Sequence, residues 1–198
     1  TMAPYVAAGE NMLLVRSEKA TGAGKARIYR RNENSWTLVK TISMTNIDTA
    51  YQTSSTINNN IAVMSDPHKT VNGLTKPGII EIYHKDQDGT DNWGLVKTIT
   101  GIENSQLGQH ICLQNNTLVA AARGNSAING KVYIYEKDQD GTDQWGEVTI
   151  LSPTTENASD NFGSSVDIYG DYIVVGASGH DNTGAIYIFK KENGTWTQ

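Results

Sequence analysis

The side chains with the clearest chemical potential belong to an acidic segment that occurs twice. Lys85–Asp91 has the sequence KDQDGTD and recurs unchanged as Lys137–Asp143. Each copy offers three carboxylates, and Asp-x-Asp-Gly is part of the pattern with which EF-hand loops bind calcium. Neither copy has the bidentate glutamate at the distance that an EF-hand requires. The motif therefore suggests calcium chemistry without specifying a complete site.

The acidic segment is equally well explained as a loop between two strands. The corresponding segments 30–35 and 190–195 are shorter and lack the acidic cluster, so this part of the chain does not depend on it. We favour the loop and predict no metal and no cofactor. If calcium does bind, we expect backbone oxygens and water to complete a site formed by Asp86, Asp88 and Asp91 or by Asp138, Asp140 and Asp143.

The remaining reactive side chains form no catalytic pattern. The histidines have neither metal-binding nor catalytic spacing; they are His68, His84, His110 and His180. Ser164 and Ser165 lack the Gly-x-Ser-x-Gly context of a hydrolase nucleophile. Cys112 lies between Ile111 and Leu113, which predicts a buried, inert thiol. We therefore predict no catalytic residue and a protein that is not an enzyme.

Composition excludes several other classes. The 198 residues carry a formal net charge of −5, whereas nucleic-acid binding needs a basic surface. A single cysteine excludes an internal disulfide framework. No apolar run reaches the roughly 18 residues of a membrane span, so we expect no membrane insertion. Residues 1–4 show no basic and apolar stretch, so no signal peptide is visible.

The elements that position these residues follow from an internal repeat. The tryptophans are spaced by 57, 52 and 51 residues: Trp36, Trp93, Trp145 and Trp196. Ahead of each lies an apolar segment that ends in an aromatic residue, and five residues before that aromatic stands a glycine: Gly24, Gly78, Gly130 and Gly184. The repeat divides the chain into four units, approximately residues 1–49, 50–106, 107–161 and 162–198.

Each unit predicts four short strands rich in Val, Ile, Tyr and Trp and bounded by Gly, Asn and Asp. In the fourth unit we place them at 163–168, 172–177, 185–190 and from Trp196 onward. The second strand is apolar on both faces, which predicts cover on both sides. The fourth strand alternates along Trp36–Ile42, which predicts one wetter face. Four-stranded units at this period predict an all-β fold, a β-propeller built of four four-stranded blades.

The fourth unit resembles the FG-GAP repeat of integrin α-chain propellers and their relatives. The resemblance rests on Asn161–Val166, Val174–Ala177 and Gly184–Phe189, and the repeat pattern extends over the whole chain. In units 1 to 3 the Phe-Gly pair is replaced by Met2-Ala3, Ala50-Tyr51 and Leu107-Gly108. The resemblance implies a β-propeller with an extracellular or cell-surface role in adhesion or ligand binding. Many integrin-type repeats bind calcium between strands 1 and 2, but here that connection is a tight turn, so the metal site is not implied.

These observations predict a non-enzymatic binding or adhesion module that recognises a protein or glycan through propeller loops. Two alternatives stay open: a carbohydrate-binding lectin, and an enzyme that uses loop carboxylates on the propeller face. Each tryptophan opens a strand at the same unit position, which favours packing over sugar stacking. The four blades either close on themselves or form part of a larger propeller, completed by missing blades or by an oligomer.

Overall fold

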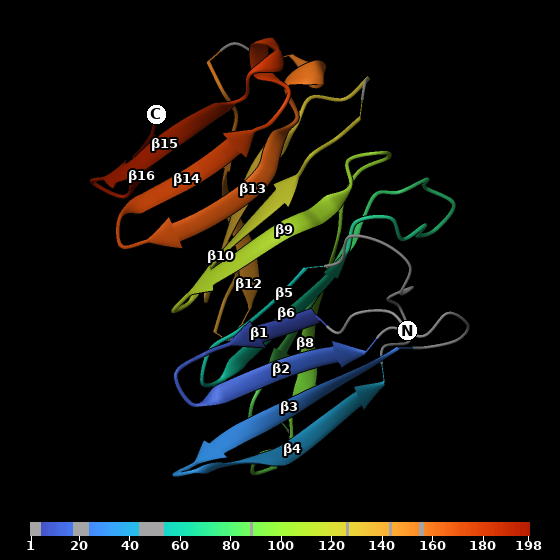
Figure 1. Cartoon of the computed structure of the whole chain (residues 1–198), viewed down its shortest axis with the longest axis vertical. Coiled ribbons are helices and arrows are strands. Elements are labelled where there is room, and N and C mark those ends of the chain that lie inside the picture. Colours follow the sequence, from blue (N-terminus) through green and yellow to red (C-terminus); the bar gives the residue numbers. More distant parts are fainter. Residues whose placement is uncertain are drawn as a thin grey trace.

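Four antiparallel sheets follow one another along the chain, each built from four consecutive strands (Figure 1). This computed structural model describes residues 5–17, 24–43, 54–87, 89–125, 127–142, 144–154 and 157–198. The strands are β1 (Tyr5–Ala8), β2 (Met12–Ser17), β3 (Lys25–Asn32), β4 (Ser35–Ser43), β5 (Ser55–Ile57), β6 (Ile61–Asp66), β7 (Ile79–His84), β8 (Gly94–Thr100), β9 (Leu107–Gln114), β10 (Thr117–Ala122), β11 (Lys131–Lys137), β12 (Trp145–Leu151), β13 (Phe162–Tyr169), β14 (Tyr172–Ala177), β15 (Ala185–Glu192) and β16 (Thr195–Thr197). Two 3-10 helices are η1 (Ala158–Asp160) and η2 (His180–Asn182).

Each sheet is a simple meander, and we call the four sheets blades 1 to 4. The sheet orders are β1-β2-β3-β4, β5-β6-β7-β8, β9-β10-β11-β12 and β13-β14-β15-β16. This arrangement confirms the predicted propeller built of four four-stranded blades. In blade 4 the predicted strands agree with the observed ones to within two residues, and β16 begins one residue before Trp196.

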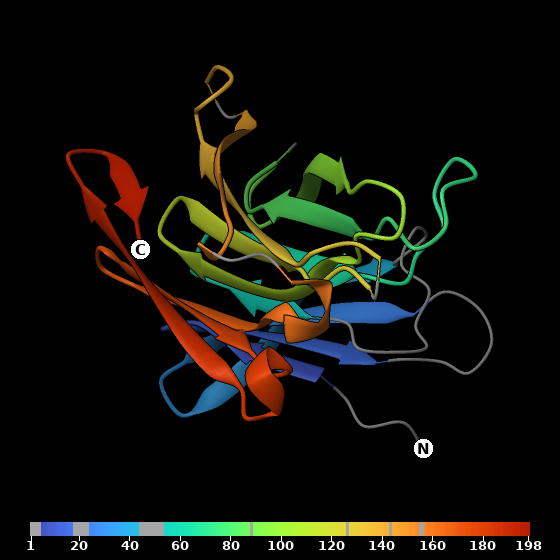
Figure 2. The same ribbon diagram turned by 90° about the horizontal axis from the view of Figure 1, so that it is seen from above.

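The blades pack in chain order around their first strands. β1 lies beside β5, β5 beside β9, and β9 beside β13. Blade 1 and blade 4 lie at opposite ends of the long axis (Figure 1), so the blades form an arc. In both ribbon views the hairpins between strands 1 and 2 lie on the left and the loop between β6 and β7 on the right (Figure 2). The arc therefore has a hairpin end and an opposite loop end.

The hydrophobic core lies between the blades and is divided into three layers. Blade 1 contributes Leu14 and Ile28 to the first layer, and blade 2 contributes Met64 and Trp93. The second layer joins blades 2 and 3, and the third joins blades 3 and 4. Because each blade is thin, its two faces are buried in different layers, which explains how a chain with 37% hydrophobic residues can build a core.

The prediction that second strands are covered on both faces is confirmed only in the middle of the arc. Every residue of β6 is buried, and so is every residue of β10 except Thr117. In β14, by contrast, Tyr172 is 48% exposed and Val174 is 40% exposed. The expectation was wrong for β14 because, within the described part of the chain, a blade covers only one of its faces.

The predicted alternation along β4 is interrupted by a register shift. Tyr29 pairs with Leu38, whereas its neighbour Ile28 pairs with Lys40, so one extra residue is inserted in β4. Directly paired residues share a face, and the insertion therefore separates Trp36 and Leu38 from Ile42. Ile42 is buried against blade 2, while Trp36 and Leu38 are about half exposed on the other face.

Tryptophans and glycines of the repeat have structural roles that the blade packing explains. Trp93, Trp145 and Trp196 are at most 9% exposed, as the packing interpretation predicts, whereas Trp36 is 46% exposed. A Cβ on Gly78 would lie 2.2 Å from the Leu107 carbonyl oxygen, and one on Gly130 would lie 2.0 Å from that of Phe162. The glycine before the third strand is thus needed where the first strand of the next blade passes.

Among the described residues no helix is long and apolar enough to cross a membrane.

Replacing Trp145 by alanine is expected to destabilise the protein strongly. The side chain is 1% exposed between blades 2 and 3, and its Nε1 donates a hydrogen bond to His84 Nε2 at 3.0 Å. We expect Trp145→Ala to lower the free energy of unfolding by about 3–5 kcal/mol, measured by urea denaturation. Leu95→Ala, at a 46% exposed position of β8, is the control and is expected to change it little. Equal effects would contradict the packing role of Trp145.

Candidate functional site

The hairpin turns between strands 1 and 2 meet at the hairpin end of the arc and line an open hollow of about 630 Å³. Blades 1, 2 and 3 each contribute one turn. The lining residues are Ala8, Gly9, Glu10, Ile57, Asn58, Asn59, Asn60, Ile61, Leu113, Gln114, Asn115 and Asn116. We call this space the hairpin cavity.

The turn of blade 2 is shaped by an asparagine side chain. Asn58 Oδ1 accepts hydrogen bonds from the backbone N–H groups of Asn60, at 2.9 Å, and Ile61, at 2.7 Å. Asparagine forms such turns readily because its short amide reaches its own backbone two residues on. In blade 3, Asn115 adopts a left-handed φ of 52°, which asparagine tolerates better than most residues.

Neighbouring turns are joined by side-chain hydrogen bonds. Asn59 Nδ2 donates to Glu10 Oε2 at 3.2 Å, which joins blades 1 and 2. Asn58 Nδ2 donates to the Asn115 carbonyl at 3.0 Å, which joins blades 2 and 3. Gln114 both donates to the Gly170 carbonyl, at 3.2 Å, and accepts from the Gly170 N–H, at 2.8 Å. Side-chain amides therefore link each of the four turns to its neighbour.

The lining of the hairpin cavity combines polar and apolar groups. Ile57 and Ile61 are 5% exposed and belong to the apolar layers between blades. Around them stand side-chain amides, each of which can donate and accept hydrogen bonds. Among the described lining residues Glu10 is the one acidic side chain, and its Oε2 accepts a hydrogen bond from Asn59. The cavity therefore suits a neutral ligand with many hydroxyl or amide groups.

Two smaller hollows adjoin the same turns. One of about 390 Å³ shares Asn60, Ile61 and Asn116 with the hairpin cavity and is further lined by His84, Lys85, Asp86, Gln87 and Lys137. The other, of about 430 Å³, shares Asn59 and Asn60 and is further lined by Asn11, Met12, Arg30, Arg31 and Lys85. Amide and charged side chains thus continue outward from the cavity.

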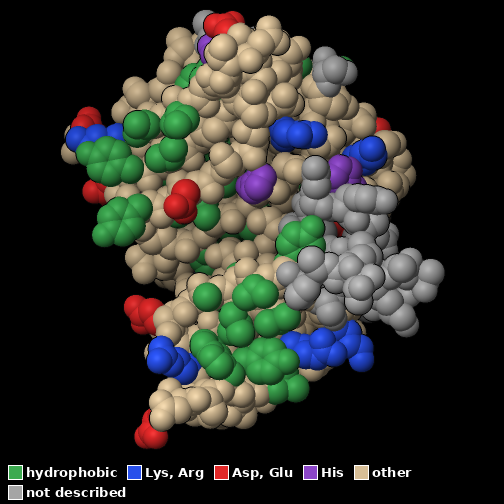
Figure 3. Space-filling model, viewed as in Figure 1, with side chains coloured by type: hydrophobic (Ala, Val, Ile, Leu, Met, Phe, Trp, Pro, Cys, Tyr) green, Lys and Arg blue, Asp and Glu red, His purple; other side chains and the backbone are tan. Residues whose placement is uncertain are grey.

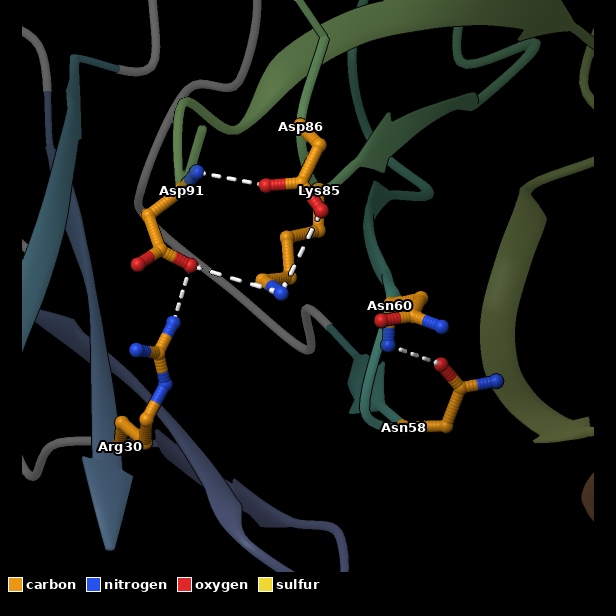
Figure 4. Close-up of polar contacts among 6 residues, drawn as sticks. All are labelled: Arg30, Asn58, Asn60, Lys85, Asp86 and Asp91. Atoms are coloured by element: carbon orange, nitrogen blue, oxygen red, sulfur yellow. Dashed lines mark hydrogen bonds and ion pairs between the residues drawn. The ribbon is translucent and has the colours of Figure 1, made fainter. Parts of the chain in front are cut away.

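Beside the cavity, an ionic cluster connects blade 1 to blade 2 (Figure 4). Arg30, from β3, forms an ion pair with Asp91 of the loop between β7 and β8. Lys85 Nζ lies 3.5 Å from Asp91 Oδ1 and 3.3 Å from Asp86 Oδ2. Asp86 Oδ1 in turn accepts a hydrogen bond from the Asp91 N–H at 2.6 Å. The hydrogen bond from Arg30 lowers the pKa of Asp91, and the same bond raises the pKa of Arg30.

Three of the four described carboxylates of the acidic loops therefore lie near a cation. In the first loop Asp86 and Asp91 are paired with cations, and in the second Lys137 Nζ lies 4.0 Å from Asp138 Oδ2. Asp140 is exposed, and the remaining carboxylates, Asp88 and Asp143, lie outside the described residues. The described part of the chain holds no cluster of three or more His, Cys, Asp or Glu side chains suited to a metal.

The other candidate residues are separated from one another. His84 accepts the hydrogen bond from Trp145, whereas His180 Nδ1 lies 2.9 Å from Asp160 Oδ2. The hydrogen bond to Asp160 raises the pKa of His180 and connects η2 to η1. Cys112 is half-buried, and burial raises its pKa to about 12, which agrees with an inert thiol.

The amide residues of the turns were not identified as a site from the sequence. They were interpreted only as hairpin turns. The available signal was the similarity of Asn58–Asn60 and Asn115–Asn116, two polar turns at the same unit position. The sequence alone does not show that the stacking of successive blades places these turns side by side.

Comparison with known proteins identifies part of the chain. Residues 145–189, which include β13, β14 and most of β15, match the FG-GAP repeat family. The chain contains an FG-GAP repeat. The resemblance of the fourth unit to this family is thereby confirmed, including the Phe162-Gly163 pair at the start of β13.

Beyond this repeat, the similarity of the chain is to solved structures. No curated protein matches its sequence. Among solved structures, a Xanthomonas protein related to the type IV secretion system is similar at 8% identity with a TM-score of 0.33. The similarity covers 98% of this chain and 91% of that one.

Replacing Asp91 by asparagine is expected to lower the melting temperature by at most a few degrees at neutral pH, because exposed ion pairs contribute little. The pKa of Asp91 is lowered in the folded protein. Its contribution is therefore present above the ordinary aspartate pKa and is lost as pH falls through the lowered value. The difference between Asp91→Asn and the unmodified chain should vanish in acid, as followed by circular dichroism. Asp140→Asn controls for the change in net charge. A difference that persists in acid would contradict the ion-pair explanation.

Calcium titration is expected to give no heat and no shift in melting temperature at millimolar calcium. The tight turns between strands 1 and 2 leave no loop to wrap the ion, and Lys85 and Arg30 already neutralise Asp91. Calorimetry on the whole chain measures this directly. A saturable heat that disappears in Asp138→Asn would show that the acidic loops bind calcium after all.

Proposed function

We propose that the chain is a non-enzymatic binding module whose hairpin cavity recognises a glycan, and that it serves ligand binding or adhesion outside the cell or at its surface. The observation that carries this proposal is the lining of the cavity by amide side chains from three successive blades. Its volume of about 630 Å³ falls within the usual range for ligand sites, roughly 300–1,000 Å³.

The chemistry of the lining favours a glycan over a protein ligand. Sugar hydroxyls both donate and accept hydrogen bonds, as do the side chains of Asn59, Gln114 and Asn116. Ala8 and Leu113 supply apolar surface against which the C–H groups of a sugar ring can pack. A protein ligand is usually bound through a central cluster of exposed aromatic side chains, and none of the lining residues that the structure describes is aromatic.

The carboxylates near the cavity support a non-enzymatic role. Acid–base hydrolysis of a glycan uses two carboxyl groups on either side of the scissile bond. Of the described residues that line the hairpin cavity, Glu10 alone is acidic. Asp86 and Asp91 face Lys85 and Arg30 (Figure 4), so they are held as ion-pair partners. FG-GAP repeats, which the resemblance associates with ligand binding, agree with this interpretation.

A glycan array probed with the labelled chain tests the proposal. The hit is then titrated against the double variant Asn59→Ala/Asn116→Ala. Both side chains are exposed lining groups, and each net hydrogen bond is worth about 0.5–1.5 kcal/mol, so we expect Kd to rise roughly five- to 150-fold.

The matched control is Gln139→Ala, an exposed amide of the loop between β11 and β12 that lines none of the three hollows. It should leave the affinity unchanged. An array without any bound glycan would overturn the glycan assignment. Turnover of a bound glycan that is lost in Glu10→Gln would overturn the non-enzymatic assignment.

A further inference from the structure

Two apolar faces are exposed, one at each end of the arc (Figure 3). The leading face is the side of blade 1 turned away from blade 2 and consists of Val6, Leu13, Val15, Tyr29, Trp36 and Leu38. The trailing face is the side of blade 4 turned away from blade 3 and consists of Tyr169, Tyr172, Val174, Ile186 and Ile188. Hydrophobic side chains gather over β1–β3 at one end and over β13 and β14 at the other (Figure 3).

The trailing face is built like faces that are buried elsewhere in the molecule. Ile188 is 55% exposed, yet Ile28, Ile82 and Ile134 at the same position of the other units are fully buried. Ile186 is 73% exposed, and its counterparts are also fully buried; these are Ala26, Ile80 and Val132. In every other blade these positions pack against the next blade.

The leading face shows the same contrast. Trp36 is 46% exposed, whereas its counterparts Trp93, Trp145 and Trp196 are 2%, 1% and 9% exposed. Each of these three contributes to the layer that its blade forms with the preceding blade. Each internal layer joins the leading face of one blade to the trailing face of the blade before it. The leading face of blade 1 is therefore suited to pack against a trailing face.

The trailing face has a hollow at the position where, in blades 2 and 3, the first strand of the next blade packs. The backbone of the following strand passes within 2.2 Å of the Cβ position at Gly78 and within 2.0 Å at Gly130. At Gly184 the nearest atom is 3.7 Å away and belongs to the neighbouring segment of the same blade. A cavity of about 550 Å³ opens there, lined by Ser164, Gly176, Ala177, Ser178, Thr183, Gly184, Ala185 and Ile186.

We propose that the occupant is a second copy of this chain, bound head to tail, with the leading face of one copy on the trailing face of the other. All three internal layers join a trailing face to the leading face of the next blade, so the new contact continues an interface already repeated in the molecule. Because each copy carries one leading face and one trailing face, two copies can form two equivalent head-to-tail contacts. The resulting ring has eight blades, within the four to eight typical of propellers.

The charges on the two faces support this pairing over the pairing of like faces. Arg27 and Arg31 lie on the leading face, because Arg27 pairs with Val15 and Arg31 with Trp36. Asp167 lies on the trailing face, opposite Val174. Lys190, opposite Tyr172 on the same face, is paired with Glu192 at 2.7 Å. Two leading faces would bring arginines together, whereas head-to-tail contact brings opposite charges together. Neither face includes a residue of the hairpin cavity, so this inference does not depend on the proposed glycan binding.

The oligomeric state of the whole chain tests the proposal. We expect sedimentation equilibrium to give twice the 21.6 kDa of one chain. Trp36→Asp on the leading face and Ile186→Asp on the trailing face should each weaken the dimer about thirtyfold or more, as loss of a central contact does. Leu95→Asp, with the same 46% exposure as Trp36 but outside both faces, is the control and should leave the dimer intact. Tyr29→Asp, at a position whose counterparts Tyr83, Tyr135 and Phe189 are 7%, 6% and 3% exposed, replaces Trp36→Asp if circular dichroism shows that variant to be unfolded.

Mixing the variants separates head-to-tail pairing from pairing of like faces. A mixture of Trp36→Asp and Ile186→Asp chains retains one intact interface and should recover dimers that neither variant forms alone. A chain that is monomeric at all concentrations would overturn the proposal and leave the faces to a different partner. It would also be overturned if Ile186→Asp had no effect while Trp36→Asp abolished the dimer. Oligomers that grow beyond the dimer with concentration would support the contact but overturn the closed ring.

Discussion

The structure depends on the apolar contact between one blade and the next. A four-stranded blade is too thin to enclose a core, so each blade obtains cover from its neighbours. Ile82 and Val63 face blade 3, while Met64 and Trp93 of the same blade face blade 1. Since adjacent residues of a strand point to opposite faces, a strand such as β6 must be apolar at every position. The repeated apolar pattern in the sequence follows from this constraint.

The same contact places the hairpin turns. Because the core layers fix how the blades stack, the turns between strands 1 and 2 lie beside one another at the hairpin end of the arc. Asn59 then reaches Glu10, and Asn58 reaches the Asn115 carbonyl. These hydrogen bonds are local consequences of blade stacking, and the hairpin cavity between them is assembled by three units that lie roughly 50 residues apart in the chain.

The sequence predicted the features that follow from a local residue pattern. It did not predict the features that depend on which strand or blade lies alongside. Strand positions in blade 4 followed from apolar runs bounded by Gly, Asn and Asp, and the packing of three tryptophans followed from their shared unit position. The exposure of Trp36 was not predictable in this way, because it depends on which blade lies beside it. The insertion in β4 likewise arises from pairing with β3, which no alternation along β4 alone reveals. The amides of the turns form a candidate site only because blade stacking places them side by side.

Blade stacking also determines which residues of this fold tolerate substitution. A face position such as Ile134 contacts the next blade and tolerates little change in volume, because interiors are close-packed. A turn residue such as Asn116 projects from the blade and contributes to no core layer. The turn of blade 4, Gly170-Asp171, differs from the asparagine turns of blades 2 and 3, yet β13 and β14 pair in the same manner as β9 and β10. Turn residues can therefore change at the hairpin end without disturbing the layers that hold the blades together, which is the physical reason for placing the proposed function there.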